Sequence, residues 1–265
     1  MPYGRSPFAL SLIAAAIVGM GSFASVPIAY AADAPPAPAA PKPAPQSADV
    51  AAPKIGKDGQ VDKGFIGAHE SFLKRGKEGP IGVLFLGDSI TAGWKGGGKE
   101  VWQQHYAALE AANFGIGGDR TQHVLWRMEN GELDGIKPKV LVLMIGTNNI
   151  GDTAENITKG DQKIIAGIHA KLPETKLLLL GIFPRGADPK DAGVAGMRAK
   201  IKTVNAELAK LDDGAKTFYL DIGGKFLDAE GVLPKDIMPD ALHPNAKGYQ
   251  IWFEAMQPLL DKLLK

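Results

Sequence analysis

The chain has no cysteine among its 265 residues, so it can form neither a disulfide framework nor a lipid-modified N-terminal cysteine. It also has no excess of charge of either sign, because 30 Lys and Arg residues stand against 29 Asp and Glu residues. No basic stripe, and no interleaving of basic with aromatic residues, runs along the chain, which argues against a nucleic-acid partner. The composition, 45% hydrophobic, is that of a globular protein held together by packing alone.

The apolar stretch near the N-terminus is too short for a stable membrane span. It extends from Phe8 to about Met20, and glycine and serine residues interrupt it before it reaches the roughly 20 residues that a bilayer requires. Arg5 precedes it, and the small-residue pattern Ala29-Tyr30-Ala31 follows it. We therefore predict a secretory signal peptide over residues 1–31, with an uncleaved anchor as the alternative, and an exported, periplasmic or extracellular protein.

The remainder of the chain divides into a spacer and a domain. Residues 32–56 are dominated by alanine and proline and cannot build a core, so we expect a disordered linker there. Residues 57–265 are expected to form one domain, which at this length buries roughly 70% of its unfolded surface. Its first part, residues 57–79, has apolar residues at helical spacing.

Four apolar runs predict the strands of a parallel sheet. They are IGVLFLG (81–87), KVLVLMIG (139–146), KLLLLGIF (176–183) and TFYLDI (217–222). Runs that are apolar at nearly every position are typical of strands buried on both faces. Because helical patterns alternate with them, the sequence predicts a three-layer α/β/α sandwich, in which ligands bind beyond the carboxyl ends of the strands.

Two candidate catalytic residues directly follow predicted strands, and two more lie in a later turn. Ser89 comes after the first strand in GDSIT, and Asn148 comes after the second in GTNN. A serine hydroxyl becomes a useful nucleophile only when a base takes its proton, and His243, three residues after Asp240 in MPDALHPN, can be that base. Taken singly, Ser89 also fits a helix cap and Asn148 a turn.

The glycine-rich segment NFGIGGDRTQ (113–122) supplies a further candidate. Asp119 followed three residues later by Gln122 resembles a capping box, which predicts that backbone N–H groups near Gly118 face an anion. Together with the Ser89 N–H and the Asn148 amide, Gly118 would complete an oxyanion hole. A simple tight loop explains these glycines equally well.

These motifs, taken in order, resemble the blocks of the SGNH (GDSL) hydrolase family. GDS, GIGGD, GTNN and the Asp240 to His243 pair carry the resemblance, and the runs NFGIGGDRTQHVLWRMENGEL and LGIFPRG are similar to the catalytic subunits of platelet-activating-factor acetylhydrolase type Ib. The resemblance implies a flavodoxin-like, five-stranded parallel sheet with Ser89 as nucleophile. It also implies Ser89, Gly118 and Asn148 as oxyanion donors, and a site that needs neither metal nor cofactor.

The resemblance and the expected export together give a functional prediction. We expect a serine esterase that acts on short-chain esters, mainly acetyl, with an acetylated carbohydrate as the leading substrate. A lysophospholipid or platelet-activating-factor-like lipid, or a thioester, is the alternative, because a signal peptide and a spacer are foreign to the cytosolic animal enzymes of the family. Assembly as a homodimer is left open.

Residues 93–100 (GWKGGGKE) nearly match a phosphate-binding loop, but Glu100 stands where that loop requires a hydroxyl. We expect instead a mobile rim over residues 94–99 beside Ser89, with Trp94 offering a stacking surface. Asp88 and Trp94 are the predicted substrate contacts.

Other classes of function leave different signatures. The lipase pattern GxSxG, the zinc pattern HExxH and the dinucleotide-binding glycine spacing are all missing from the sequence. The remaining alternative is a secreted carbohydrate-binding module that kept the fold and lost turnover. The joint presence of the nucleophile, the base pair and the oxyanion donors argues against it.

Overall fold

The structure is a computed structural model that describes residues 46–265. The predicted signal peptide and most of the predicted spacer lie outside the described residues. Within the described part, one sheet contains parallel strands in the order β2-β1-β3-β4-β5. The strands are β1 (Val83–Gly87), β2 (Ala112–Gly115), β3 (Val140–Met144), β4 (Lys176–Leu180) and β5 (Thr217–Leu220). The predicted fold class is confirmed.

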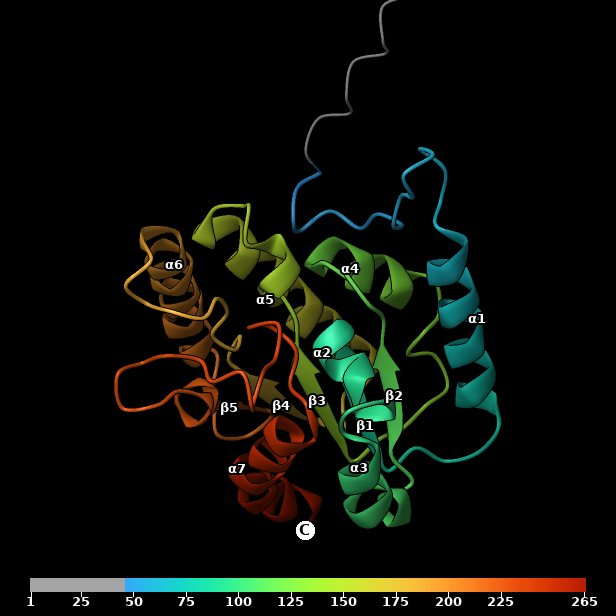
Figure 1. The fold of residues 1–265 in the computed structure, drawn as a ribbon. Coiled ribbons are helices and arrows are strands. Elements are labelled where there is room, and N and C mark those ends of the chain that lie inside the picture. Colours follow the sequence, from blue (N-terminus) through green and yellow to red (C-terminus); the bar gives the residue numbers. More distant parts are fainter. Residues whose placement is uncertain (1–45) are drawn as a thin grey trace, which may run out of the picture. The chain divides into compact units, whose positions relative to one another are not determined.

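Helices cover both faces of this sheet (Figure 1). One face carries α1 (Lys63–Lys77), α4 (Thr121–Glu129), α5 (Ala154–Lys171) and α6 (Ala192–Ala209), and the other carries α3 (Lys99–His105) and α7 (Ala246–Leu264). The short helix α2 (Ser89–Ala92) and the 3₁₀ turns η1 (Gly93–Lys95), η2 (Ala107–Leu109), η3 (Thr147–Asn149) and η4 (Gly223–Phe226) lie in the connections. A hydrophobic core lies on each face of the sheet, and alternate strand residues point into one core or the other. Leu84 packs in the core with α1 and α4, and Phe85 packs in the core with α3 and α7.

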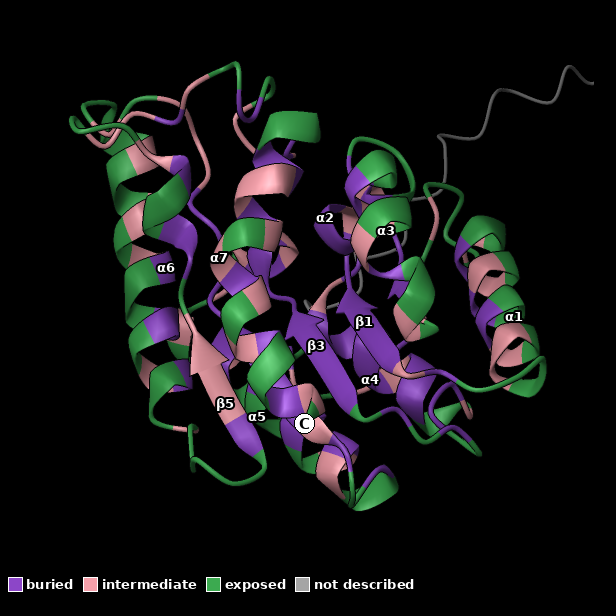
Figure 2. Ribbon diagram, turned by 90° about the horizontal axis from the view of Figure 1, so that it is seen from below, coloured by how far each residue is buried: buried purple, intermediate pink, exposed green. Residues whose placement is uncertain are grey.

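The central strands are buried along their whole length, as Figure 2 shows for β1 and β3. Because helices cover both faces, each position of these strands needs an apolar side chain, which is why the sequence pattern is continuous rather than alternating. Strand β5 lies at one edge of the sheet and is only partly buried. The sandwich therefore presents the carboxyl ends of β1 and β3 at the middle of one edge.

All four strands predicted from apolar runs are present, but β2 was not predicted. Its sequence, ANFG, is short and contains Asn113, a residue that is uncommon in strands. The structure satisfies this polar side chain locally, since its amide donates to Thr91 O at 2.8 Å and its Oδ1 accepts from the Gly115 N–H at 2.9 Å. Strand β2 pairs with β1 at the other edge of the sheet.

Residues 46–62 form a segment that we call the N-terminal strap, which includes the last part of the predicted linker. Ala48 and Ala52 are buried. The Ala52 N–H donates to Gln122 O at 3.1 Å, and the Thr121 hydroxyl donates to Ala48 O at 2.7 Å. Residues 46–56 therefore pack on the domain in the structure, where the sequence predicts a linker. In the part of the chain that is described, no helix is long and apolar enough to cross a membrane.

Candidate active site

Ser89 lies just after the carboxyl end of strand β1. It is the first residue of α2, and Asp88 before it is the N-cap, whose Oδ1 accepts from the Ile90 N–H at 2.9 Å. An acceptor at this position satisfies an N–H group that the first turn of a helix leaves free. Ser89 is half-buried at the carboxyl edge of the sheet, where the sequence predicts the nucleophile.

The turn before α7 brings the predicted base to this serine. His243 Nε2 lies 2.9 Å from Ser89 Oγ, although the two residues are 154 positions apart. On the other side of the ring, Nδ1 lies 2.6 Å from Asp240 Oδ2. The second oxygen of Asp240 accepts from the N–H groups of Leu242 (3.1 Å) and His243 (2.8 Å), which closes the turn. The structure thus joins all three predicted catalytic side chains.

This turn is exposed and locally strained. The side chains of Asp240 and His243 are 55% and 41% exposed. Ala241 between them has φ of +57°, a left-handed conformation that costs an L-residue about 1–2 kcal/mol. Partial burial alone would raise the pKa of Asp240, but hydrogen bonds from the His243 ring and backbone outweigh it and hold that pKa below its ordinary value. Asp240 therefore stays ionised and keeps Nδ1 of the ring protonated.

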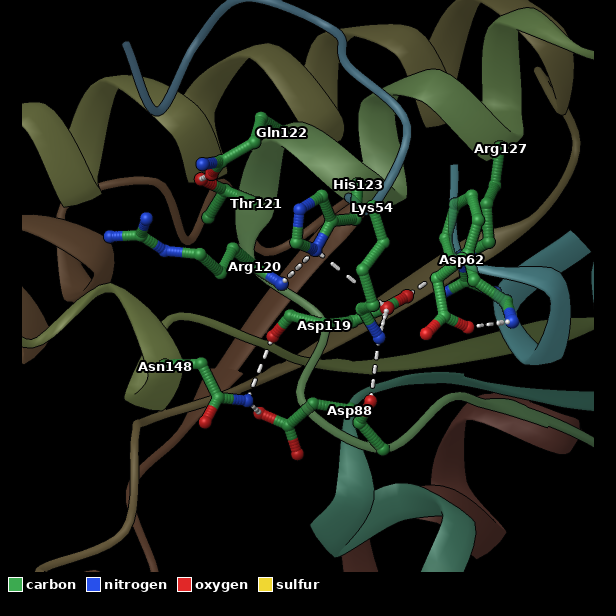
Figure 3. A network of polar contacts seen from close by, with 12 residues as sticks. Lys54, Asp62, Asp88, Asp119, Arg120, Thr121, Gln122, His123, Arg127 and Asn148 are labelled. Atoms are coloured by element: carbon green, nitrogen blue, oxygen red, sulfur yellow. Dashed lines mark hydrogen bonds and ion pairs between the residues drawn. The ribbon is translucent and has the colours of Figure 1, made fainter. Parts of the chain in front are cut away.

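The other two predicted oxyanion donors, Gly118 and Asn148, lie in the connections that follow β2 and β3. Gly118 has φ of +73° and is exposed. Asn148, in η3 after β3, donates through Nδ2 to Asp119 O at 2.9 Å, and the same nitrogen is 3.5 Å from Asp88 Oδ2 (Figure 3). Because an amide group carries two hydrogens, one ties the two loops together and the other makes only a long contact. The three predicted donors thus border one edge of the sheet.

The helix cap predicted at Asp119 is wrong. The N-cap of α4 is Arg120, whose N–H donates to His123 Nδ1 at 3.0 Å. Burial lowers the pKa of His123 to about 3, and the charges of Lys54, Arg120 and Arg127 act in the same direction. The ring is therefore neutral and able to accept this hydrogen bond.

Asp119 belongs instead to a network of buried charges that sequence reasoning missed. Its carboxylate pairs with Arg127 Nε at 3.0 Å and with Lys54 Nζ at 2.6 Å. Burial raises the pKa of Asp119, and Arg127 and Lys54 oppose this by favouring the carboxylate. Arg127 also contacts Glu132 Oε1 at 2.6 Å and donates to Gly87 O at 3.3 Å. The loop with Gly118 is thereby joined to the end of β1, the strand that precedes Ser89.

Neither of the two predicted substrate contacts, Asp88 and Trp94, reaches the surface in the structure. Asp88 is 0% exposed. Burial raises its pKa to about 7, opposed by the Ile90 N–H and reinforced by the charge of Asp119. Trp94 is 1% exposed and packs against Tyr249 in the second core, with ring centroids 4.6 Å apart. The expected rim is an ordered part of the fold, formed by η1 and α3.

Fold and site together define an ester hydrolase of the SGNH class: a three-layer α/β sandwich with a Ser, His and Asp chain at the carboxyl edge of its sheet. The chain belongs to the GDSL-like Lipase/Acylhydrolase family, whose sequence model matches residues 85–251. It is accordingly a carboxylic ester hydrolase.

The relatives agree with this assignment. The chain is 38% identical over 216 residues to platelet-activating factor acetylhydrolase IB subunit alpha2 of Rattus norvegicus, covering 81% of this chain and 91% of that protein. Solved structures with the same fold include a GDSL-like lipase from Bacteroides thetaiotaomicron (TM-score 0.60, 18% identity, 75% and 98% of the two chains covered). Another is a variant of an acetylxylan esterase from Geobacillus stearothermophilus (TM-score 0.52, 17% identity, 70% and 96% covered).

Proposed function

We propose that the protein is an exported serine esterase that removes short acyl groups, above all acetyl, from carbohydrate esters. The observation that carries the proposal is the continuous chain of contacts from Ser89 Oγ through His243 to Asp240, at 2.9 and 2.6 Å. A hydroxyl, an imidazole and an ionised carboxylate in this order are the arrangement that activates a serine for acyl transfer.

The first half of the reaction transfers the acyl group to the enzyme. Ser89 Oγ attacks the ester carbonyl carbon while its proton passes to His243 Nε2, and Asp240 stabilises the resulting imidazolium through Nδ1–H. The carbonyl oxygen becomes an oxyanion, which the N–H groups of Ser89 and Gly118 and the Asn148 amide stabilise. His243 then gives its proton to the leaving alcohol oxygen as the carbon–oxygen bond breaks.

The second half releases the acyl group. Water attacks the acyl-enzyme while His243 takes one of its protons, the same donors hold the second oxyanion, and the proton returns to Ser89 Oγ as the carboxylic acid leaves. Both halves use one base and one set of donors, so no group beyond this chain's own residues is needed for the proton transfers.

The preference for acetyl is supported by the names of the relatives, since the rat protein is an acetylhydrolase and the Geobacillus protein is an acetylxylan esterase. Open space above the glycine loop is compatible with a bulky alcohol half. A Cβ added to Gly117 would meet nothing within 4 Å, and one at Gly118 would meet only Lys54 Nζ, at 3.9 Å. Export rests on the signal peptide predicted over residues 1–31.

A lipid ester is the second candidate. The 38% identity to the platelet-activating factor acetylhydrolase subunit favours it, because that likeness extends over most of both chains. The acetyl group is common to both candidates, and they differ in the alcohol: a sugar hydroxyl in one and a glycerol backbone in the other. A thioester would keep the same acyl half.

One set of assays separates these possibilities. The full-length protein is tested on p-nitrophenyl esters from acetyl to palmitoyl, on acetylated xylan, on a platelet-activating-factor-like lipid and on acetyl thioesters. We expect acetyl to be preferred and xylan to be deacetylated faster than the lipid. Preference for palmitoyl would contradict the acetyl assignment, and faster lipid turnover would favour the second candidate.

Covalent labelling tests the nucleophile itself. A fluorophosphonate probe should label the wild-type protein and should fail to label Ser89→Ala. Labelling that persists in Ser89→Ala would contradict the role of Ser89, and a folded wild-type protein that is never labelled would indicate a binding module. Export is tested by N-terminal sequencing of the protein recovered outside the cytoplasm, which should begin after residue 31.

A further inference from the structure

Lys54 extends from the N-terminal strap to the loop that carries Gly118. Its ammonium nitrogen is 2.6 Å from Gly117 O and 2.6 Å from Asp119 Oδ1, so it contacts the residues on both sides of Gly118 (Figure 3). Its side chain is only 16% exposed, and its nitrogen also lies 5.4 Å from the centre of the Phe65 ring. A lysine in this position is a part of the site, although it comes from a segment that the sequence assigns to the linker.

The contact with Gly117 O determines the direction of the Gly118 N–H. The carbonyl of Gly117 and the N–H of Gly118 belong to one planar trans peptide unit, and the two groups therefore point in opposite directions. An ammonium that holds the carbonyl oxygen on the strap side directs the N–H to the other side. That N–H is one of the donors on which the proposed oxyanion hole depends.

Nothing in the glycine residues themselves opposes a flip of this peptide. Glycine adopts left-handed and right-handed conformations with nearly equal ease, and Gly118 is already left-handed at φ of +73°. Both glycines are exposed, and a Cβ on Gly117 would meet nothing within 4 Å. A flipped peptide would aim a carbonyl oxygen, instead of an N–H, at the developing oxyanion.

We propose that Lys54 is a positioning residue for the oxyanion hole, which holds the Gly117–Gly118 peptide with its N–H facing the reacting carbonyl. The inference rests on the proposed function, since it takes Gly118 as an oxyanion donor. A hydrogen bond from a cation to the carbonyl also polarises the peptide and makes its N–H a stronger donor. The strap is then a working part of the enzyme and not a tether.

The strap is fixed well enough to place this ammonium. The Ala52 N–H donates to Gln122 O at 3.1 Å, two residues before Lys54. The carbonyl of Lys54 accepts from the Asp62 N–H at 2.8 Å, and Asp62 caps α1 by accepting from the Phe65 N–H at 2.7 Å. The strap is thus hydrogen-bonded to α4 at Ala52 and to the start of α1 at Lys54.

The test compares Lys54→Met with the wild-type protein on p-nitrophenyl acetate. Methionine keeps an apolar stem against Phe65 and removes the charge. We expect kcat to fall by roughly 10- to 100-fold with KM nearly unchanged, because losing a whole oxyanion donor costs about 100- to 1,000-fold and a misdirected donor costs less. Lys54→Arg should recover much of the loss, since it returns a cation to the carbonyl.

Two controls make this result specific. Lys159→Met removes a lysine from an exposed pair with Glu155 (2.7 Å) and should leave kcat unchanged. Adding methylammonium to Lys54→Ala should restore part of the lost turnover, because the small cation can occupy the position of the ammonium. Thermal unfolding of each variant shows that the protein is folded at the assay temperature.

The outcomes separate this inference from the proposed function. If Lys54→Met keeps the wild-type kcat while Asn148→Ala loses turnover, Lys54 has no positioning role and the proposed site stands. A rise in KM alone would also overturn the inference, because it would mean a contact with substrate. If Ser89→Ala retains full turnover, the proposed function itself fails. A folded Lys54→Ala variant that methylammonium does not rescue counts against the inference as well.

Discussion

The site has an exposed side, where the Asp240 and His243 side chains are 55% and 41% exposed and contact each other within a single turn, and a buried side, where Asp119 and Arg127 are fully buried. The contacts between the first two residues are local in sequence, and their one catalytic long-range contact is the one from His243 to Ser89. The contacts of the second pair join segments that are far apart, from the strap at Lys54 to strand β1. One site is therefore assembled from a turn with mostly local contacts and a widely connected loop.

The difference suits what each side does in the reaction. His243 takes a proton from Ser89 or water and gives it to the leaving alcohol or back to Ser89, so an exposed ring suits its role. The donors of the oxyanion side act without reorganising only if their loop is already fixed before the reaction. The buried ion pair between Asp119 and Arg127, in a region of low dielectric constant, provides that fixation.

The largest expected effect comes from the exposed side. His243→Ala removes the base and should lower kcat by roughly 10⁴- to 10⁶-fold, because the residues of a catalytic triad act as a unit. Because the side chain is exposed, the free energy of unfolding should change by less than about 1 kcal/mol. Steady-state kinetics and urea denaturation measure the two quantities. Turnover within about tenfold of wild type would contradict the role of His243.

The two sides also differ in how far the sequence predicts them. The spacing of Asp240 and His243 is sufficient to predict a triad, because a turn determines their geometry and only one long-range contact, to Ser89, has to be assumed. The partners of Asp119 cannot be predicted in this way. Lys54 lies in an Ala- and Pro-rich segment whose composition indicates a linker, and only folding brings it to Gly117, 63 positions away.

Glycine-rich composition misled the prediction at Trp94. Its flanking glycines suggest a mobile rim, yet a Cβ at Gly93 would lie 2.0 Å from Tyr249 Oη and one at Gly98 would lie 2.5 Å from the Trp94 ring. These glycines permit close packing rather than motion. The apolar strands were predicted correctly because a strand buried on both faces has an apolar residue at nearly every position of its sequence. Close packing of an aromatic ring against a glycine backbone produces no such sequence pattern.

The second prediction concerns the buried side. Arg127→Met leaves Asp119 and Glu132 buried without their shared partner, which should lower the free energy of unfolding by about 3–5 kcal/mol. Lys74→Met, at an exposed pair with Glu78, is the matched control and should change it by less than about 1 kcal/mol. Urea denaturation measures both. A loss as small as the control's would mean that the network does not stabilise the loop.

The third prediction uses pH to separate the two sides. The pKa of Asp88 is raised to about 7 in the folded protein, so the unfolded chain loses this proton first and Asp88 destabilises the fold progressively from about pH 4 to about pH 7. Asp88→Asn keeps an acceptor for the Ile90 N–H and removes the titration. The variant should match wild type near pH 4 and unfold several degrees higher above pH 7, as measured by thermal denaturation.

Asp240 should behave in the opposite way. Its pKa is lowered, so its contribution to stability is present above its ordinary pKa and is lost as the pH falls through the folded value. Asp240→Asn should therefore reduce stability only above about pH 4. If Asp88→Asn and wild type unfold with the same pH dependence, the buried carboxyl is not protonated and the contrast between the two sides fails.

The smallest effect is expected at Ala241, the left-handed residue of the exposed turn. Ala241→Gly relieves about 1–2 kcal/mol of steric cost and loses about 0.5–1 kcal/mol through the greater entropy of the unfolded chain, so the net stabilisation should lie between about 0 and about 1.5 kcal/mol. The hydrogen bonds that the Leu242 and His243 N–H groups donate to Asp240 persist in this variant, and kcat should stay within about twofold of wild type. A fall of about tenfold in kcat with normal stability would show that the strained backbone itself orients His243. The exposed side would then depend on preorganisation as much as the buried side does.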